Sequence, residues 1–161
     1  MPWFISDTMK EDFHWMLRTL EKLSTKYPTL GTLAKRWEQY LLLEKWTIEV
    51  EEFWTLPYVY SEMKVIDPQL YNKLSKATLL IFKGDLNYRK LLGETNWVPT
   101  ERFSKALQGF HPAPLVTLRT LKADLICGLK PGVAETTAAR SENWLITGDY
   151  AVIQFDGSAK A

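Results

Sequence analysis

Cysteine is almost absent from the sequence. Cys127 is the single cysteine among 161 residues, so no disulfide can form within the chain, which suits a reducing compartment. No apolar run is long enough to span a bilayer. The first residues, MPWFISD, lack the basic segment and apolar stretch of a secretory signal. We therefore expect a cytoplasmic protein without a membrane span.

An excess of charge of either sign is also missing. Twenty lysines and arginines face 19 acidic residues, which leaves a net charge of +1. No long-range field therefore draws the chain toward nucleic acid or anionic lipid, and we expect neither as a partner. The pattern Gly-x-Gly does not occur, so a dinucleotide fingerprint and a P-loop are absent. With two histidines and no cysteine pair, a zinc site is not expected.

The composition that remains is that of a folded domain. Hydrophobic residues make up 46% and charged residues 24% of the chain, and its length suits one domain with a real core. Seven tryptophans are present. They indicate either a tryptophan-rich core or side chains that face a part of the protein outside this sequence. Cys127 lies in an apolar stretch, which favours inert packing over a nucleophile.

Helical and strand-like patterns alternate along the chain. Apolar spacing and end signals predict helices at 8–23, 30–43, 68–76, 86–92 and 101–107, with Asp67 as the cap of the third. Apolar runs predict strands or extended segments at 2–5, 46–50, 78–82, 115–118, 125–127 and 150–155. Residues 131–143 are polar and small, which predicts an exposed excursion. The alternation predicts an α/β layered domain with a largely parallel sheet, and a strand at 78–82 that is buried on both faces.

Two segments share one layout, in which an apolar strand is followed by a break with an aspartate and then a helix. They end in Asp7 and Asp85. Ligands of open parallel sheets bind beyond the carboxyl ends of the strands, so the two carboxylates could hold a divalent cation that a phosphate bridges. Both aspartates could equally be helix caps. Residues 82–93, FKGDLNYRKLLG, add several polar and basic side chains around one glycine turn.

Four motifs resemble those of the damage-control phosphatase family, most of all its eukaryotic sugar-phosphate phosphatase branch. They are PWFISDT near the start, FKGDLNYRKLLG, the stretch GFHPAPLVTLRTLKADLICGLKPG, and QFDG near the end. The resemblance runs from Pro2 to Gly157. It implies that residues 1–161 are the C-terminal portion of a catalytic domain, with a Rossmann-like α/β/α layered sheet that is incomplete at its N-terminal side.

The resemblance also implies a reaction and a site. The reaction is metal-dependent hydrolysis of small phosphorylated sugars such as fructose 1-phosphate and fructose 6-phosphate, with manganese, magnesium, cobalt or nickel as the cofactor. Asp7 corresponds to a metal ligand of the family, Lys122 to a phosphate-binding lysine, and Asp7 and Asp85 are the expected catalytic residues. The segment that corresponds to the family's substrate-binding residues is Asp85, Leu86, Asn87, Tyr88 and Arg89.

The sequence departs from the family at its start. Family members carry an adjacent Asp-Asn pair upstream of the PWF motif, where both residues bind the metal, and a helical N-terminal region; neither occurs here. A cation held by one carboxylate should bind weakly. An inactive phosphatase portion, a non-enzymatic interaction module and a methyltransferase that uses S-adenosylmethionine, an activity proposed for animal members, therefore stay open. We expect the missing N-terminal portion or a second copy of the chain as a partner.

Overall fold

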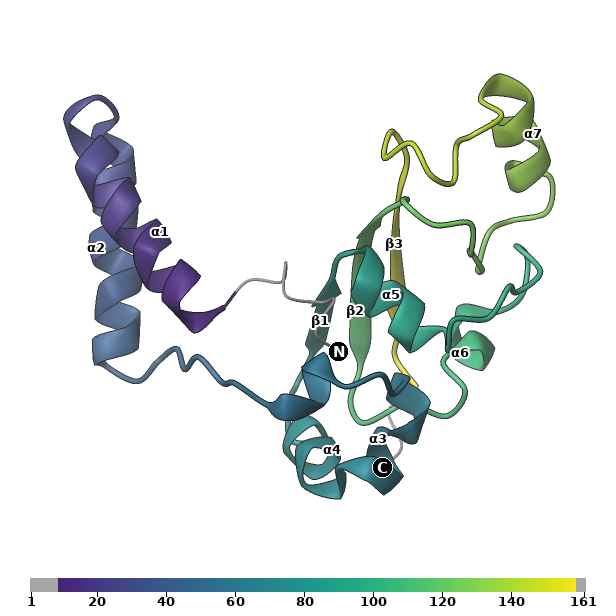
Figure 1. Ribbon diagram of the computed structural model, residues 1–161, viewed down its shortest axis with the longest axis horizontal. Helices are drawn as coiled ribbons and strands as arrows, with labels where there is room; N and C mark the ends of the chain where they lie inside the picture. The colour runs from purple at the N-terminus through teal and green to yellow at the C-terminus, as the bar shows by residue number, and fades with distance from the viewer. Residues whose placement is uncertain (1–8, 159–161) are drawn as a thin grey trace. The chain divides into compact units, whose positions relative to one another are not determined.

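The computed structural model describes residues 9–158 (Figure 1). The chain forms two compact units, the first ending at Leu56 and the second beginning at Pro57. Within the described residues, no helix has the length and apolar character that a bilayer span needs.

The first unit is a helical hairpin. Helix α1 spans Lys10–Lys22, a short 3-10 helix η2 spans Leu23–Thr25, and α2 spans Pro28–Leu42. Pro28 occupies the first turn of α2, where its missing N–H costs nothing. The helices pack through Leu17 and Ala34, which are buried. Both predicted helices are confirmed, and α2 begins at Pro28 rather than at residue 30.

Aromatic side chains close the open end of this hairpin. The ring of Trp46 lies 5.7 Å from that of Trp37 and 5.1 Å from that of Tyr40. The backbone N–H of Trp46 donates to the carbonyl of Tyr40 over 3.0 Å. Residues 46–50 were predicted to form a strand or an extended segment. The described residues form no strand there, and the backbone of Trp46 turns back onto α2. A 3-10 helix η3, Glu52–Thr55, follows.

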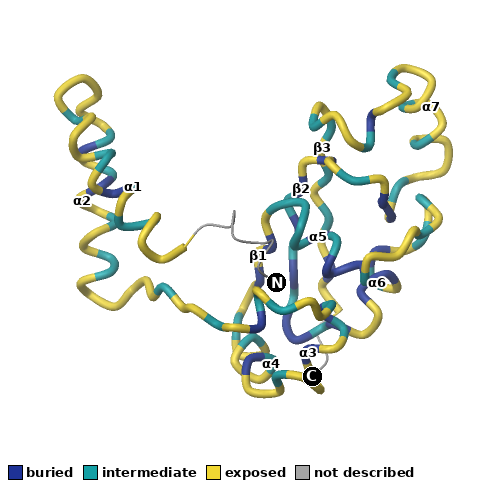
Figure 2. The backbone as a smooth tube through the Cα atoms, in the orientation of Figure 1, coloured by how far each residue is buried: buried dark blue, intermediate teal, exposed yellow. Residues whose placement is uncertain are grey.

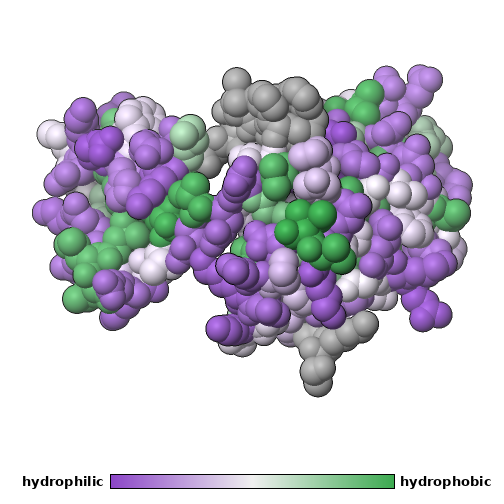
Figure 3. Space-filling model, turned by 60° about the horizontal axis from the view of Figure 1, so that its bottom comes forward, coloured by the Kyte–Doolittle hydropathy of each residue, from purple (hydrophilic) through white to green (hydrophobic). Residues whose placement is uncertain are grey.

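Apolar side chains also reach the surface of the hairpin. Trp15, Leu42 and Leu43 are exposed, and Figure 3 shows hydrophobic side chains gathered on the hairpin at the left of the view. Among the tryptophans that the structure describes, Trp144 alone is buried. The expectation of a tryptophan-rich core is therefore wrong for the described residues.

The second unit holds the sheet and several short helices. The strands are β1 Leu80–Lys83, β2 Leu115–Thr120 and β3 Ala151–Asp156. The helices are η4 Tyr60–Glu62, α3 Met63–Ile66, α4 Pro68–Leu74, α5 Asp85–Leu91, α6 Phe103–Ala106 and α7 Val133–Arg140. The predicted cap of α4 is confirmed, since Oδ1 of Asp67 accepts from the N–H of Leu70 over 2.9 Å.

The sheet has the order β1-β2-β3, with β1 and β2 parallel and β3 antiparallel to β2. The α/β class is confirmed, whereas the sheet is mixed rather than largely parallel. The described residues 125–127 form no strand. Their carbonyls accept hydrogen bonds from side chains instead: the carbonyl of Leu125 accepts from Arg119, and the carbonyl of Cys127 accepts from Gln154. A segment whose backbone groups have such partners needs no neighbouring strand.

The two faces of the sheet differ in burial. One carries buried residues of β1 and β2, among them Phe82, Leu115 and Thr117, and α5 packs against these two strands (Figures 1 and 2). On the other face, Ile81 and Ile153 are exposed by 62% and 75%. The prediction that β1 is buried on both faces is therefore wrong, because no described element covers the face that carries Ile81.

Between β2 and β3 the chain makes the expected exposed excursion. Each residue of α7 is at least partly exposed. Trp144 anchors the excursion, with its ring 6.1 Å from that of Tyr150 in an edge-on arrangement. The polar composition of 131–143 thus predicted its exposure correctly, and only its helix was missed.

Candidate functional site

A cleft of about 460 Å³ opens at the carboxyl ends of β1 and β2 and runs toward the start of β3. Because β1 and β2 are parallel, their carboxyl ends share one edge of the sheet, where open α/β sheets bind their ligands. The polar and charged residues that line the cleft are Lys83, Asp85, Arg119, Thr120 and Lys122.

Asp85 and Arg119 form the central ion pair of this cleft. Nε of Arg119 donates to Oδ1 of Asp85 over 2.7 Å, with the arginine side chain fully buried and the aspartate 18% exposed. No other described residue donates a side-chain hydrogen bond to this carboxylate. The pair therefore holds the carboxylate in place while part of it still faces solvent.

The guanidinium of Arg119 has further partners on the opposite wall. Nη2 donates to the carbonyl of Ala123 over 2.8 Å, and Nη1 donates to the carbonyl of Leu125. Its central carbon lies 4.3 Å from the ring centroid of Tyr88, a cation–π contact. A buried arginine is stable only with such a complete set of partners.

Two lysines bring positive charge to the cleft. Lys83 ends β1 and Lys122 follows β2, and both are exposed. The preceding Leu121 is buried, and its backbone donates to Tyr150 and accepts from Gly148, each over 2.9 Å. Within residues 9–158, no carboxylate lies at ion-pairing distance from either lysine. Both ammonium groups are thus available to an anion.

Of the residues that the sequence suggested for substrate, Asp85 and Lys122 line the cleft. Asn87 uses its amide elsewhere, accepting from the hydroxyl of Tyr60 and donating to the carbonyl of Lys83 over 2.7 Å. Arg89 pairs with Glu94 at 3.0 Å on the surface. Leu86 is half-buried and does not line the cleft.

Tyr88, the remaining residue of that segment, lies in the core. Its ring stacks on that of Phe103, with centroids 6.4 Å apart, and its hydroxyl is 3.7 Å from Sγ of Cys127. Burial, reinforced by Cys127, raises the pKa of Tyr88 far above its ordinary value. Burial likewise raises the pKa of the Cys127 thiol to about 11. The thiol stays protonated at neutral pH, as the prediction of inert packing requires.

The expected metal ligand Asp7 lies outside the described residues. Among residues 9–158, no three or more His, Cys, Asp or Glu side chains come together as a metal site would require. Asp85, the one carboxylate among the described residues that line the cleft, already pairs with Arg119. The described residues alone therefore do not fit a divalent cation.

A second side-chain pair lies at the opposite end of the sheet. Nδ1 of His111 is 2.8 Å from Oδ2 of Asp156, and both side chains are largely buried. The hydroxyl of Ser158 donates to the same carboxylate over 2.6 Å. In register, Asp156 pairs with Leu115 at the start of β2, whereas the cleft lies at its end. This pair fastens the last strand to the loop before β2.

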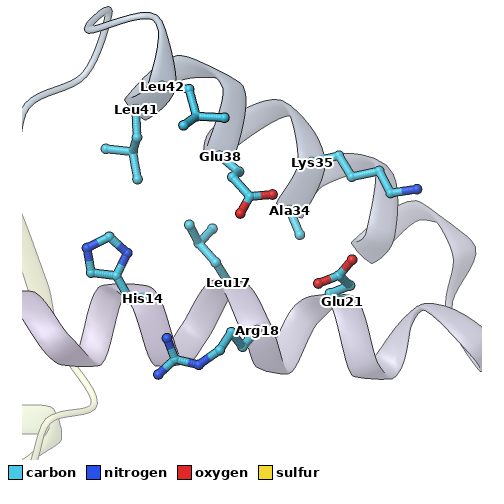
Figure 4. Close-up of a pocket in the computed structure, with 9 residues that line it drawn as sticks. All are labelled: His14, Leu17, Arg18, Glu21, Ala34, Lys35, Glu38, Leu41 and Leu42. Atoms are coloured by element: carbon cyan, nitrogen blue, oxygen red, sulfur yellow. The ribbon is translucent and has the colours of Figure 1, made fainter.

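The hairpin has a groove of its own, of about 290 Å³. Figure 4 shows His14, Leu17 and Glu21 of α1 facing Ala34 and Glu38 of α2. Leu17 and Ala34, which pack the two helices together, form its floor. The groove is a consequence of helix packing.

Comparison with known proteins identifies the family. A family model described as the damage-control phosphatase ARMT1-like domain matches residues 1–137. The chain belongs to this family. The motif resemblance found in the sequence is thereby confirmed, and both strands that end at the cleft lie inside the matched region.

Several full-length ARMT1 relatives are similar to this chain. The damage-control phosphatase ARMT1 of Mus musculus is 46% identical over 157 residues, which cover 98% of this chain and 35% of the relative. The ARMT1 of Homo sapiens is 45% identical over 157 residues, with coverages of 98% and 35%. That of Danio rerio is 41% identical over 155 residues, covering 96% and 34%. The chain thus spans about a third of the length of these relatives.

Sequence reasoning missed Arg119 as a site residue of this ARMT1-like domain. The signal was present, since Arg119 stands two and four residues after Thr117 and Leu115, on the face of β2 that is buried. An arginine at a buried strand position requires a carboxylate partner. Asp85, at the end of the neighbouring parallel strand, is the partner that this rule would have selected.

Proposed function

We propose that the chain is the phosphate-binding portion of a metal-dependent phosphatase that acts on small phosphorylated metabolites, with fructose 1-phosphate and fructose 6-phosphate as substrates. The observation that supports this most directly is the cleft in which a carboxylate held by Arg119, that of Asp85, and the ammonium of Lys122, which has no carboxylate partner among the described residues, lie together beyond the ends of two parallel strands. Membership of the damage-control phosphatase family supports the same reaction class.

The side chains of the cleft suit a phosphomonoester. Lys122 and Lys83 would bind the phosphoryl oxygens and offset their charge as the bond to the sugar breaks. Asp85, held through Oδ1, would accept a hydrogen bond at its other oxygen from a sugar hydroxyl or from the attacking water. In phosphoryl transfer, the protein contributes mainly by binding and orienting the reacting groups.

The metal requirement rests on the family resemblance and on Asp7. Manganese, magnesium, cobalt or nickel would supply further charge stabilisation to the phosphoryl group. The described residues do not complete such a site, so we assign the metal no step. Removal of divalent cations with EDTA should abolish phosphate release, Mn²⁺ should restore it, and Asp7→Ala should prevent that recovery.

Lys122 provides the direct test of the cleft. Phosphate release from fructose 1-phosphate with Mn²⁺ should show a KM raised about tenfold or more in Lys122→Ala, because an ammonium contact to a phosphate is lost. Lys130→Ala removes an equally exposed lysine outside the cleft and should leave KM unchanged. Equal KM values in both variants would remove Lys122 from the site.

The exposed sheet face favours a second candidate, a non-enzymatic interaction module. Ile81, Ile153 and Phe155 are exposed by 62%, 75% and 64%, and they share one face of the sheet. Apolar faces of this kind mark contacts between proteins, here with a second copy of the chain. Sedimentation should show a dimer that Ile153→Lys converts to monomer, and a wild-type chain that stays monomeric at all concentrations would exclude this candidate.

A further inference from the structure

Arg119 joins the two walls of the cleft. One wall is the start of α5, where Asp85 accepts from Nε of the arginine over 2.7 Å. The other wall is the segment that carries Lys122, where Ala123 and Leu125 accept from the two terminal nitrogens through their carbonyls. A single guanidinium therefore sets the position of the carboxylate relative to the lysine.

Only an arginine can make this set of contacts. Its planar guanidinium directs its N–H donors along fixed directions, whereas a lysine offers one compact ammonium on a flexible stem. The ring of Tyr88 lies against the guanidinium at 4.3 Å and fixes its plane. The group is therefore rigid as well as fully bonded.

The burial of a charge destabilises the fold, so a charge buried at this place points to a role. Moving an arginine out of water costs several kcal/mol, and apolar residues of similar size often stabilise a core as well or better. The side chain of Arg119 has no exposed surface, so it cannot reach a substrate in the cleft directly. Its contribution must pass through Asp85 and the backbone that follows Lys122.

We propose that Arg119 is the positioning residue of the cleft, holding the Asp85 carboxylate and the Lys122 segment at one fixed separation so that both engage the same phosphorylated substrate. The proposal rests on the phosphatase function proposed above. It predicts that Arg119 governs the rate of the reaction more than the affinity for phosphate.

The kinetic test compares Arg119→Lys with wild type in the full 161-residue chain, using fructose 1-phosphate and Mn²⁺. We expect kcat to fall about tenfold or more, because a misoriented carboxylate costs rate, while KM changes less than about threefold, because both lysines remain. Arg140→Lys, the same change at an exposed position of α7, should alter neither value. A folded Arg119→Lys protein with the wild-type kcat would overturn the proposal.

A double variant tests whether Arg119 acts through Asp85. Asp85→Asn alone should lower kcat, and Asp85→Asn combined with Arg119→Lys should be no slower than the slower single variant, because residues that act as a unit are not additive. If the two losses in kcat multiply, Arg119 acts independently of Asp85 and the proposal fails.

A spectroscopic readout separates this inference from the phosphatase function. The buried Nε–H of Arg119 should give a slowly exchanging ¹H–¹⁵N signal that shifts in Asp85→Asn, and the backbone amides near Lys122 should shift in the same variant. If wild type releases no phosphate but these shifts occur, the proposed function fails while the coupling across the cleft stands. If Asp85→Asn leaves all these signals unchanged, the coupling is absent. Asp85→Asn keeps the buried arginine, so this measurement also serves if Arg119→Lys does not fold.

Discussion

The two ends of the sheet carry hydrogen-bonded pairs of similar geometry and different surroundings. At the carboxyl end of β2, Arg119 and Asp85 lie 2.7 Å apart beside a cleft with two lysines that have no carboxylate partner among the described residues. At the other end, His111 and Asp156 lie 2.8 Å apart, with Ser158 donating to the same carboxylate. In residues 9–158, no side chain donates to the second oxygen of Asp85, whereas both oxygens of Asp156 have partners within the chain.

The difference supports the proposal that Arg119 and Asp85 belong to a site, and that His111 and Asp156 belong to the framework. A carboxylate that the protein satisfies completely contributes to stability alone. A carboxylate that is held on one side and open on the other is arranged to receive a ligand. We call the end of the sheet with Arg119 and Asp85 the open end, and the end with His111 and Asp156 the closed end. Changes at the open end should therefore alter both stability and activity, and changes at the closed end should alter stability alone.

The largest effect should follow from Arg119→Met. Asp85 and two backbone carbonyls would lose their donor, and we expect the free energy of unfolding to fall by about 3–5 kcal/mol. Urea titration followed by circular dichroism measures this loss. Asp85→Asn/Arg119→Met should recover part of it, since no unpaired charge then remains, and a double variant as unstable as Arg119→Met would contradict the ion-pair explanation.

The next effect concerns Cys127, which lies beneath the open end against Tyr88. Burial raises the pKa of its thiol from 9.0 to about 11, so its alkylation by iodoacetamide near neutral pH should be about a hundredfold slower in the folded chain than in urea. Because the folded state favours the protonated thiol, the contribution of Cys127 to the free energy of unfolding should be fully present below pH 9.0 and be lost as the pH rises toward about 11.

Alkylation that is equally fast with and without urea would show that Cys127 is accessible in the folded state. The same experiment on Arg119→Lys sharpens the comparison of the two ends, because loosening of the open end should speed alkylation. His111→Phe, at the closed end, should leave the alkylation rate as it is in wild type.

His111→Phe tests the closed end directly. Asp156 would keep Ser158 as its side-chain donor, and we expect a loss of about 1–3 kcal/mol in the free energy of unfolding. Phosphate release per folded molecule should not change, since the pair lies at the other end of β2. Loss of activity without loss of stability would place His111 in the reaction and break the distinction between the two ends.

The smallest effect should come from Lys83→Gln at the open end. Glutamine keeps an N–H donor at this exposed position, so only the charge of the contact with a phosphate is lost. This loss should cost about 1 kcal/mol at most, and KM for fructose 1-phosphate should rise about fivefold or less. The urea midpoint should be unchanged. A fall in kcat with constant KM would show that Lys83 acts on the reaction rather than on binding.

Local signals in the sequence predicted local structure well. The apolar spacing of α1 and the cap at Asp67 act within a few residues, and both are confirmed. Asp85 and Lys122 were predicted as site residues from sequence motifs, and both line one cleft. Arg119 and Asp85 are 34 residues apart, and their pairing depends on which strands lie side by side. That information is a property of the assembled sheet.

The errors have the same origin. The apolar run that contains β1 suggested burial on both faces, but burial depends on what covers each face, and no described element covers the face of Ile81. The segment 125–127 is as apolar as a strand and is buried, yet its carbonyls pair with Arg119 and Gln154. The spacing of apolar residues indicates where a side chain points. It does not determine which group forms hydrogen bonds with the backbone.

The excursion between β2 and β3 leaves the sheet beside Lys122 and returns at Ala151, and both residues line the cleft. Its helix α7 is exposed along its length. A fluorophore on Ala138→Cys, with Cys127 protected by its burial, would test whether this excursion responds to a ligand in the cleft. A change in its emission on addition of phosphate would make α7 a position for a biosensor label.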